Sequence, residues 1–222
     1  MSEARDAASA REDVLARIRA ASGGCGATAA DEAYAAIHRG YLRSHHDPGG
    51  TDLVALFAER AADYRAVVRR VQEDEIAAAV GDVIAALPRR AVLAPGGVPD
   101  EWLAGLTAGT DVLRDDPPLS HAQLDQVPAV LTGCAVAIAE TGTVVLDHGA
   151  GQGRRALTLL PDFHLAVVRA GQVAADLPDA LERLRPSRPL TFISGPSATS
   201  DIELIRVEGV HGPRQLHILV AG

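Results

Sequence analysis

The chain has 222 residues, enough for one large α/β domain or for a compact domain with an appended helical segment. Hydrophobic residues make up 47% of the chain and charged residues 23%, a composition typical of soluble globular proteins. The formal net charge is -8, and no basic stripe with interleaved aromatic residues is present. Because nucleic acids are bound through clustered basic side chains, we expect no nucleic-acid partner.

Two cysteines occur, Cys25 and Cys134. They are too few for a disulfide scaffold, and no C-x-x-C pair is present to ligate a metal or an iron-sulfur cluster. The first 21 residues are charged and helix-like, without the apolar centre of a signal peptide, and no run of about 18 apolar residues occurs. We therefore expect a cytoplasmic protein without membrane insertion and without a redox cofactor of its own, so that any electrons in its pathway are carried by another chain.

Residues 1–50 are predicted to form an N-terminal helical segment, and residues 51–222 an α/β domain. Apolar residues recur at helical spacing within 3–21, and Gly23 and Gly24 stop this first helix. A second helix is predicted from Thr28, whose hydroxyl can cap it, to near Gly40.

The α/β domain is predicted to begin with a helix from Asp52 and a strand in "RAVVRRV". A helix over 73–87 and a strand in "RAVLAP" follow, which implies a parallel crossover. Next come a short helix at 101–106, a strand at 111–113 and a helix capped by Ser120.

Five apolar runs of strand length complete the predicted sheet: "AVAIAE", "TVVLD", "HLAVVRA", "PLTFIS" and "LHILVAG", with a helix in "LPDALERL". The first two lie too close together for a crossover and are predicted to form a hairpin. The predicted fold class is α/β, with a mixed central sheet, flanking helices and additional N-terminal helices.

Three polar loops follow predicted strands, and we expect them to meet at one sheet edge, because open α/β sheets bind ligands beyond their strand ends. The first loop is "AETGT". Glu140 closes an apolar strand there, where a partly buried carboxylate can serve in acid-base or nucleophilic catalysis. The candidate anion-binding residues beside it are Thr141, Gly142 and Thr143. The alternative is a hairpin with a solvated glutamate.

The second loop is "HGAGQGRR", residues 148–155. Its glycines can turn backbone N–H groups toward an anion, and Arg154 and Arg155 supply fixed positive charge beside them. Gly151, Gly153 and Arg154 are therefore candidate anion-binding residues. The spacing matches neither a dinucleotide fingerprint nor a P-loop. A flexible surface loop is the alternative.

The third loop is "SGPSATSDIE", continued by "VEGVHGPRQLH". Its hydroxyl groups can donate to an anion, although the same groups can instead cap a turn starting at Asp201. An imidazole before the last strand could act on a bound substrate. The candidate binding residues here are Ser194, Ser197, Thr199, Asp201, Glu203, His211 and Arg214.

A metal site is not expected. The densest group of potential ligands is His45, His46 and Asp47, on a loop with proline and glycine. Its spacing does not match the recurrent metal-binding patterns.

The segments "TGCAVAIAETGTVVL", "GQGRRALTLLPDFHLAVV" and "ISGPSATSDIELIRVEGVHGPRQLHILV" resemble the LUD-domain family, and within it the lactate utilization protein C group. The resemblance covers roughly residues 60–222. It implies a fold similar to the NagB/RpiA/CoA-transferase-like group. It also implies a part in the oxidation of L-lactate to pyruvate beside partner proteins that carry iron-sulfur clusters. The resemblance supplies no established catalytic residue.

Two functions stay open at this point. One is a non-redox component of a lactate-oxidising system, with a small carboxylate or phosphate as a possible ligand. The other is a stand-alone CoA-transferase-like or carboxylate-binding enzyme that uses Glu140.

Overall fold

The structure is a computed structural model that describes residues 2–21, 27–40, 50–185, 187–199, 207–208 and 212–222. Contacts divide the chain into two compact units, residues 1–42 and 43–222. The domain boundary predicted at residue 50 stays a prediction. His45, His46 and Asp47, the group considered for a metal, lie outside the described residues.

The first unit contains the two predicted helices, α1 (Ser2–Ala21) and α2 (Ala27–Ala35). Helix α2 ends earlier than the predicted end near Gly40. Arg39 folds back over this end, where its guanidinium donates to the Tyr34 carbonyl at 3.0 Å and lies 4.3 Å from the centre of the Tyr34 ring. The Arg39 side chain thus donates to a carbonyl at the end of α2. If the helix had continued, a backbone N–H would have bonded this carbonyl instead.

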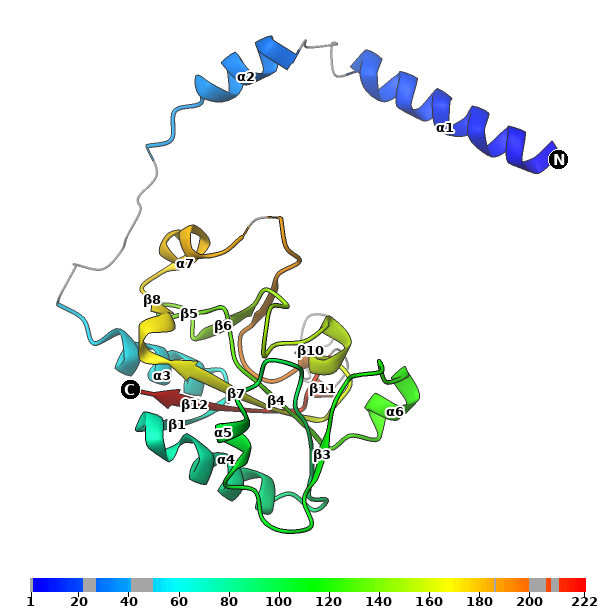
Figure 1. Cartoon of the computed structure of the whole chain (residues 1–222). Helices are drawn as coiled ribbons and strands as arrows, with labels where there is room; N and C mark the ends of the chain where they lie inside the picture. Colours follow the sequence, from blue (N-terminus) through cyan, green and yellow to red (C-terminus); the bar gives the residue numbers. More distant parts are fainter. Residues whose placement is uncertain (1, 22–26, 41–49, 186, 200–206, 209–211) are drawn as a thin grey trace. The chain divides into compact units, whose positions relative to one another are not determined.

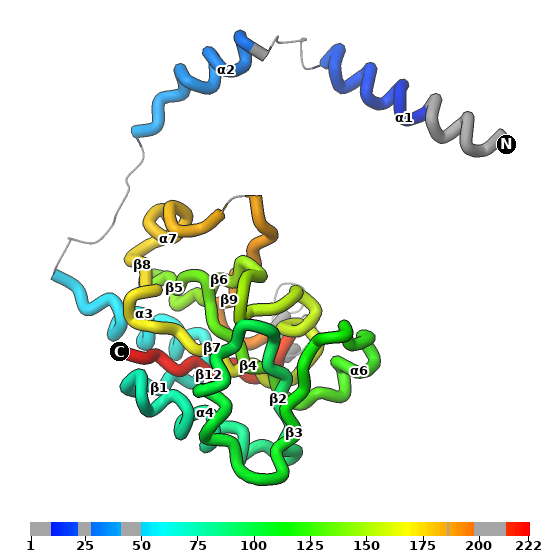
Figure 2. Tube along the Cα trace, viewed as in Figure 1, coloured from blue at the N-terminus to red at the C-terminus, as the bar shows by residue number. Residues whose placement is uncertain are grey.

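The second unit is built on a six-stranded sheet in the order β1-β12-β7-β4-β2-β3, with every neighbouring pair parallel (Figure 1). Figure 2 shows the last strand, in red, beside β7 and β1. The strands are β1 (Val67–Val71), β2 (Ala91–Leu93), β3 (Asp111–Leu113), β4 (Ala129–Thr132), β7 (Phe163–Arg169) and β12 (Gln215–Ala221).

Both faces of this sheet are covered, as the continuous apolar runs of its central strands require. On one face, Leu165 and Leu219 pack with helices α4 (Ile76–Ala85) and α5 (Asp100–Leu103). On the other face, Ala166 and Ile218 pack with helix α3 (Leu53–Asp63) and a second sheet. Adjacent residues of each strand therefore belong to opposite cores.

The second sheet has the order β8-β5-β6-β9. Its strands are β5 (Val136–Ile138), β6 (Thr143–Leu146), β8 (Val173–Ala174) and β9 (Thr191–Ile193). The predicted hairpin of β5 and β6 is present, but it lies in this sheet, whereas we expected one mixed sheet. The reason is burial on two sides: Ala137 faces the central sheet, while Val136 and Ile138 pack under α7 (Leu177–Arg183).

Strand β4 was not predicted, although it lies between β7 and β2 near the middle of the central sheet. It is only four residues long and is bounded by Pro128 and Gly133. So short an apolar run has no periodicity that separates a strand from a buried helical turn.

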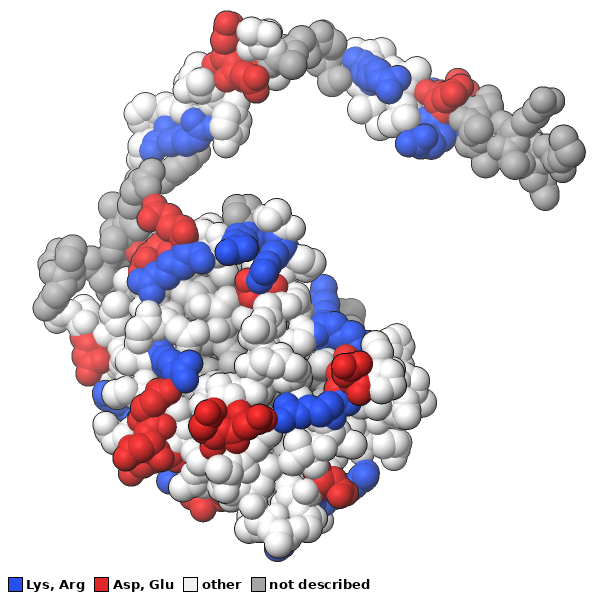
Figure 3. All heavy atoms as spheres, viewed as in Figure 1, with Lys and Arg blue, Asp and Glu red and all other residues white. Residues whose placement is uncertain are grey.

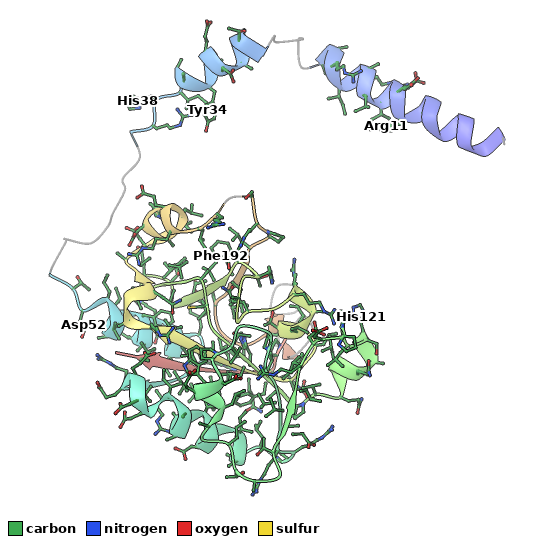
Figure 4. All side chains as sticks on the ribbon, in the orientation of Figure 1. Arg11, Tyr34, His38, Asp52, His121 and Phe192 are labelled. Atoms are coloured by element: carbon green, nitrogen blue, oxygen red, sulfur yellow. The ribbon has the colours of Figure 1, made fainter. Side chains whose placement is uncertain are left out.

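The remaining elements connect these layers. They are α6 (His121–Asp125), the 3-10 turns η1 (Glu73–Glu75), η2 (Arg155–Thr158) and η3 (Ala170–Gln172), and the paired strands β10 (Ala198–Thr199) and β11 (Val207–Glu208). Asp52, labelled in Figure 4, caps α3 by accepting the Ala55 N–H at 3.0 Å. Ser120 caps α6, as predicted. Among the described residues, no helix is both long and apolar enough to cross a bilayer.

Candidate functional site

A cavity of about 320 Å³ lies where η2, β9 and the amino ends of β7 and β12 come together. Its polar walls include Arg155, Thr158 and His164, and the stretch from Thr191 to Ser197 forms another side. Phe192, labelled in Figure 4, belongs to that stretch and is 46% exposed. The cavity thus combines one arginine, several hydroxyl groups and apolar side chains.

The first and third predicted loops meet beside this cavity, whose wall includes Ser194 of the third loop. The Thr143 and Ser194 hydroxyl oxygens are 2.8 Å apart, and those of Thr143 and Thr141 are 2.7 Å apart. Strands β6 and β9 pair in antiparallel register, which places Thr143 beside Ser194. A row of three hydrogen-bonded hydroxyls therefore leads from the turn that holds Glu140 to the cavity wall.

His148 connects the second loop to the same wall. Its Nδ1 lies 2.9 Å from the Gly153 carbonyl oxygen, and its Nε2 lies 3.0 Å from the Thr191 hydroxyl. Because a carbonyl oxygen only accepts, Nδ1 carries a proton, and in the neutral ring Nε2 accepts from the Thr191 hydroxyl. This bond joins the second loop to β9.

The second loop is hydrogen-bonded throughout rather than loose. The Gly151 N–H donates to the Gly96 carbonyl at 2.9 Å, so this amide is not directed at a ligand. Asp147 accepts from Arg188 at 2.8 Å and from Gln152 at 2.9 Å. Burial would raise the pKa of Asp147, but these hydrogen bonds outweigh it and hold the pKa below its usual value.

The two adjacent arginines of this loop have different surroundings. Arg154 donates to both carboxylate oxygens of Asp115, at 2.7 and 3.0 Å, and its pKa is raised chiefly by this pairing. Arg155 lines the cavity and makes no ion pair within the described part of the chain. Of the two arginines expected to supply positive charge, Arg155 is therefore the one at the cavity, whereas Arg154 was the one named as a binding residue.

His164 is the buried polar group of the cavity wall, with 1% of its surface exposed. Its Nε2 lies 2.8 Å from the Thr132 hydroxyl, and its Nδ1 has no hydrogen-bond partner among the described residues. Burial lowers the pKa of His164 to about 4, so the ring is neutral near pH 7. A buried nitrogen without a hydrogen-bond partner destabilises the folded state. Such an atom therefore indicates a position where a ligand or a water could supply the missing partner.

Two of the glycines predicted to bind an anion serve packing. Gly142 has φ +59, and a Cβ there would overlap the backbone nitrogen of Ala61 on α3. A Cβ on Gly151, at φ +74, would come within 3.0 Å of the Gly97 carbonyl oxygen. Both positions therefore need glycine for close backbone approach and a positive φ.

A second cavity, of about 800 Å³, lies at the carboxyl ends of β2 and β3. It is lined by Pro95–Asp100, Arg114–Asp116, Gly153 and Leu157. Of the predicted anion-binding residues, Gly153 is the one that lines this cavity. Most of its charged groups are paired: Arg114 donates to Asp100 at 3.0 Å, and Asp115 is held by Arg154, while Asp116 adds a further carboxylate. This pairing leaves it less suited than the first cavity to a charged ligand.

The remaining predicted site residues are dispersed. Glu140 is partly buried in the β5–β6 turn, where its N–H donates to the Ala175 carbonyl at 3.1 Å, and it is not among the residues that line either cavity. Arg214 is exposed and paired with Asp162, its Nε 2.9 Å from that carboxylate. Thr199 lies in β10, and its side chain is not described. Asp201, Glu203 and His211 lie outside the described residues.

Sequence reasoning did not identify His164, Thr158 or Thr191 as site residues. His164 left a usable signal, because a histidine within the apolar run of "FHLAVV" must either be exposed or have a buried polar partner. Thr158 and Thr191 left none, since isolated threonines near turns are common.

Charged groups elsewhere on this unit are mixed in sign. On the face shown in Figure 3, acidic and basic side chains lie next to one another. Among the described residues, no group of three or more His, Cys, Asp or Glu side chains is arranged to hold a metal ion. Cys134 is buried, and burial raises the pKa of its thiol to about 12.

Fold and site together define an α/β domain with a small polar cavity beside its second sheet. Comparison with known proteins assigns the family. The LUD domain model matches residues 119–221. The chain is 52% identical over 175 residues to lactate utilization protein C of Deinococcus radiodurans, covering 77% of this chain and 80% of that protein. The chain therefore belongs to the LUD-domain family, as the sequence motifs predicted.

Two further relatives support this assignment. A crystal structure of a DUF162 family protein from Deinococcus radiodurans superposes with a TM-score of 0.66 at 46% identity, covering 77% of this chain and 96% of that one. The uncharacterized protein YkgG of Escherichia coli is 36% identical over 109 residues, covering 44% of this chain and 47% of that protein. The α/β fold class is confirmed, and the expected likeness to the NagB/RpiA/CoA-transferase-like group stays a prediction.

Proposed function

We propose that this chain is a component of L-lactate utilization, taking part in the oxidation of L-lactate to pyruvate together with iron-sulfur partner proteins. The observation that carries the proposal is the 52% identity over 175 residues to a protein named lactate utilization protein C. The aligned stretch covers four fifths of that relative, so a shared role is a reasonable inference for the domain as a whole.

The cysteine content supports a division of labour with partners. Iron-sulfur clusters are typically held by four cysteine thiolates, and this chain contains two cysteines. Cys134 is buried with a raised pKa, so its thiol stays protonated near pH 7 and is a poor metal ligand. We therefore assign the redox centres to partner proteins and this chain a non-redox role in the cytoplasm.

Two measurements test the proposal. A strain lacking this chain should lose growth on L-lactate and keep growth on pyruvate, with a plasmid copy restoring it. An anaerobic pull-down of the tagged protein from lactate-grown cells, followed by iron analysis, should recover iron-containing proteins that an untagged strain does not yield. Unchanged growth on L-lactate would remove the proposed role, and an iron-free isolate would remove the proposed partners.

A second candidate is a CoA-transferase-like enzyme. One observation favours this candidate. A row of hydrogen-bonded hydroxyls runs from Thr141 to Ser194 and joins the turn that holds Glu140 to the cavity wall. In such an enzyme the Glu140 carboxylate would take the acyl group of a CoA thioester and release CoA as the thiolate.

The test is acyl exchange between a CoA ester and a free carboxylate, with Glu140→Gln as the variant and the exposed Glu101→Gln as the matched control. Exchange that only Glu140→Gln abolishes would support this candidate. No exchange by the unmodified protein would exclude it for the esters tried.

A further inference from the structure

We propose that the cavity between η2 and β9 binds a small monocarboxylate, with the Arg155 guanidinium holding the carboxylate and the hydroxyls and imidazole of the wall contacting the rest of the molecule. The identification of that monocarboxylate as L-lactate or pyruvate rests on the proposed function. The assignment of a monocarboxylate site rests on the cavity itself.

The cationic group is the first step of the argument. The other arginines that approach this part of the unit are paired: Arg154 with Asp115, Arg188 with Asp147 and Arg214 with Asp162. Arg155 lines the cavity without an ion pair among the described residues. A guanidinium presents parallel N–H donors that match the two oxygens of a carboxylate, so Arg155 is equipped to bind one.

The buried histidine is the second step. The Thr132 hydroxyl has His164 Nε2 as its side-chain partner, at 2.8 Å, and Thr132 is fully buried. A buried hydroxyl hydrogen needs an acceptor, and Nε2 can accept only when the proton of the neutral ring is on Nδ1. The nitrogen of His164 that lacks a partner is therefore an N–H donor, itself almost without accessible surface, in a residue that lines the cavity.

The size and polarity of the cavity are the third step. A volume of about 320 Å³ is at the small end of ligand cavities, and Ile193, Phe192 and Leu216 give part of it an apolar lining. Among the described lining residues Arg155 is the one charged group, and the buried imidazole is neutral. One positive charge with neutral donors and an apolar wall suits a singly charged acid with a short carbon chain better than a phosphate dianion.

The experiment is a direct binding titration of the full chain with L-lactate, pyruvate, acetate and inorganic phosphate, by ligand-observed NMR and calorimetry. Arg155→Gln removes the charge at the cavity. Arg90→Gln removes the charge of an exposed arginine that lines neither cavity and serves as the matched control. Arg155→Lys keeps the charge without the paired donors. Thermal unfolding of each variant verifies that it is folded.

L-lactate or pyruvate should bind the unmodified protein and Arg90→Gln equally, and bind Arg155→Gln about tenfold or more weakly, with Arg155→Lys in between. Binding that Arg155→Gln leaves unchanged would overturn the assigned site. Preference for phosphate, or no binding of any of the three carboxylates, would overturn the ligand class.

The outcomes separate this proposal from the proposed function. Binding of acetate without L-lactate or pyruvate supports the monocarboxylate site and contradicts the identification of the ligand. Growth on L-lactate that depends on this chain, combined with absent binding, leaves the proposed function standing and overturns the site.

Discussion

The guanidinium of Arg154 donates through Nε and Nη2 to the two carboxylate oxygens of Asp115, at 2.7 and 3.0 Å. The same Nη2 also donates to the Leu119 carbonyl at 2.6 Å, and the Leu119 N–H returns a hydrogen bond to Asp115 at 2.8 Å. One closed set of charge-assisted hydrogen bonds thus fixes the glycine-rich loop to the segment after β3. Geometry of this kind is what gives a partly exposed ion pair measurable strength.

Asp115→Asn should therefore lower the free energy of unfolding at pH 7 by roughly 1–2 kcal/mol, a figure reduced for the partial exposure of Arg154. The hydrogen bond from Arg154 is the main cause that lowers the pKa of Asp115. A lowered pKa in the folded state contributes stability above the unfolded pKa of about 3.9 and loses it as the pH falls through the folded pKa. Urea unfolding at pH 7 and pH 3 should show the deficit of the variant shrinking in acid.

Asp100→Asn is the matched control, because Asp100 forms a similar 3.0 Å ion pair with Arg114 while its side chain is 89% exposed. We expect a change of less than about 0.5 kcal/mol for it. Equal losses in the two variants would show that the closed geometry at Asp115 adds nothing.

His164 should make stability depend on pH in a different window. Burial lowers its pKa to about 4 in the folded protein, against about 6.5 in an unfolded chain. Between these values the unfolded state binds the proton, so the free energy of unfolding falls as the pH drops from 6.5 toward 4, by roughly 1–3 kcal/mol in all. His164→Gln should flatten this slope in denaturant titrations between pH 7 and pH 4.5, whatever its stability at pH 7.

His217 supplies the comparison, since burial lowers its pKa too but its side chain is only half buried. His217→Gln should remove a smaller part of the slope. A slope that His164→Gln leaves intact would mean that another group takes up the proton.

Gly142→Ala should destabilise the protein by roughly 2–4 kcal/mol, because it combines a positive φ with overlap against the Ala61 backbone. Gly109 also has a positive φ, +84, but open space around its Cβ position. Gly109→Ala should cost only the conformational strain, about 1 kcal/mol. Thermal unfolding of both variants measures the difference, and equal losses would show that α3 yields to the added methyl group.

Thr143 and Ser194 should be energetically coupled through their 2.8 Å hydrogen bond. A double-mutant cycle of Thr143→Val and Ser194→Ala, read by urea unfolding, should give a coupling free energy of about 0.5–1.5 kcal/mol. Thr107 and Thr110, whose exposed hydroxyls are 3.3 Å apart, form the control pair and should show little coupling. A coupling near zero for the first pair would mean that solvent replaces the bond at no cost.

Local signals in the sequence were sufficient where an element is defined by its own residues. Ser120 marks the start of α6 because its side-chain oxygen, placed before the helix, is itself the cap, whereas Thr28, the other predicted cap, lies inside α2. Partners distant in sequence could not be inferred in this way. Arg154 and Arg155 are equivalent in the printed sequence, and only the approach of Asp115, 39 residues away, separates the ion-paired arginine from the one at the cavity.

The candidate site shows the same limit. Parts of the three loops come together, since Thr143 contacts Ser194, and Arg155 of the second loop lines the same cavity as Ser194. The glycines of the second loop were interpreted as an anion cradle, whereas Gly151 there, like Gly142 in the first loop, allows close packing of backbone. Sequence alone does not separate these two uses of glycine, because both require the same absence of a side chain.

Strand β12 lies between β1 and β7, so residues 67–71 join the central sheet only through residues 215–221. The pairing of Val67 with His217 closes a loop of about 150 residues, and such distant contacts slow folding. During synthesis, β1 has no neighbour in the sheet until the ribosome has produced β12, so its backbone N–H and C=O groups are unpaired in the meantime. The order of strands thus makes completion of the central sheet dependent on the last segment of the chain to be synthesised.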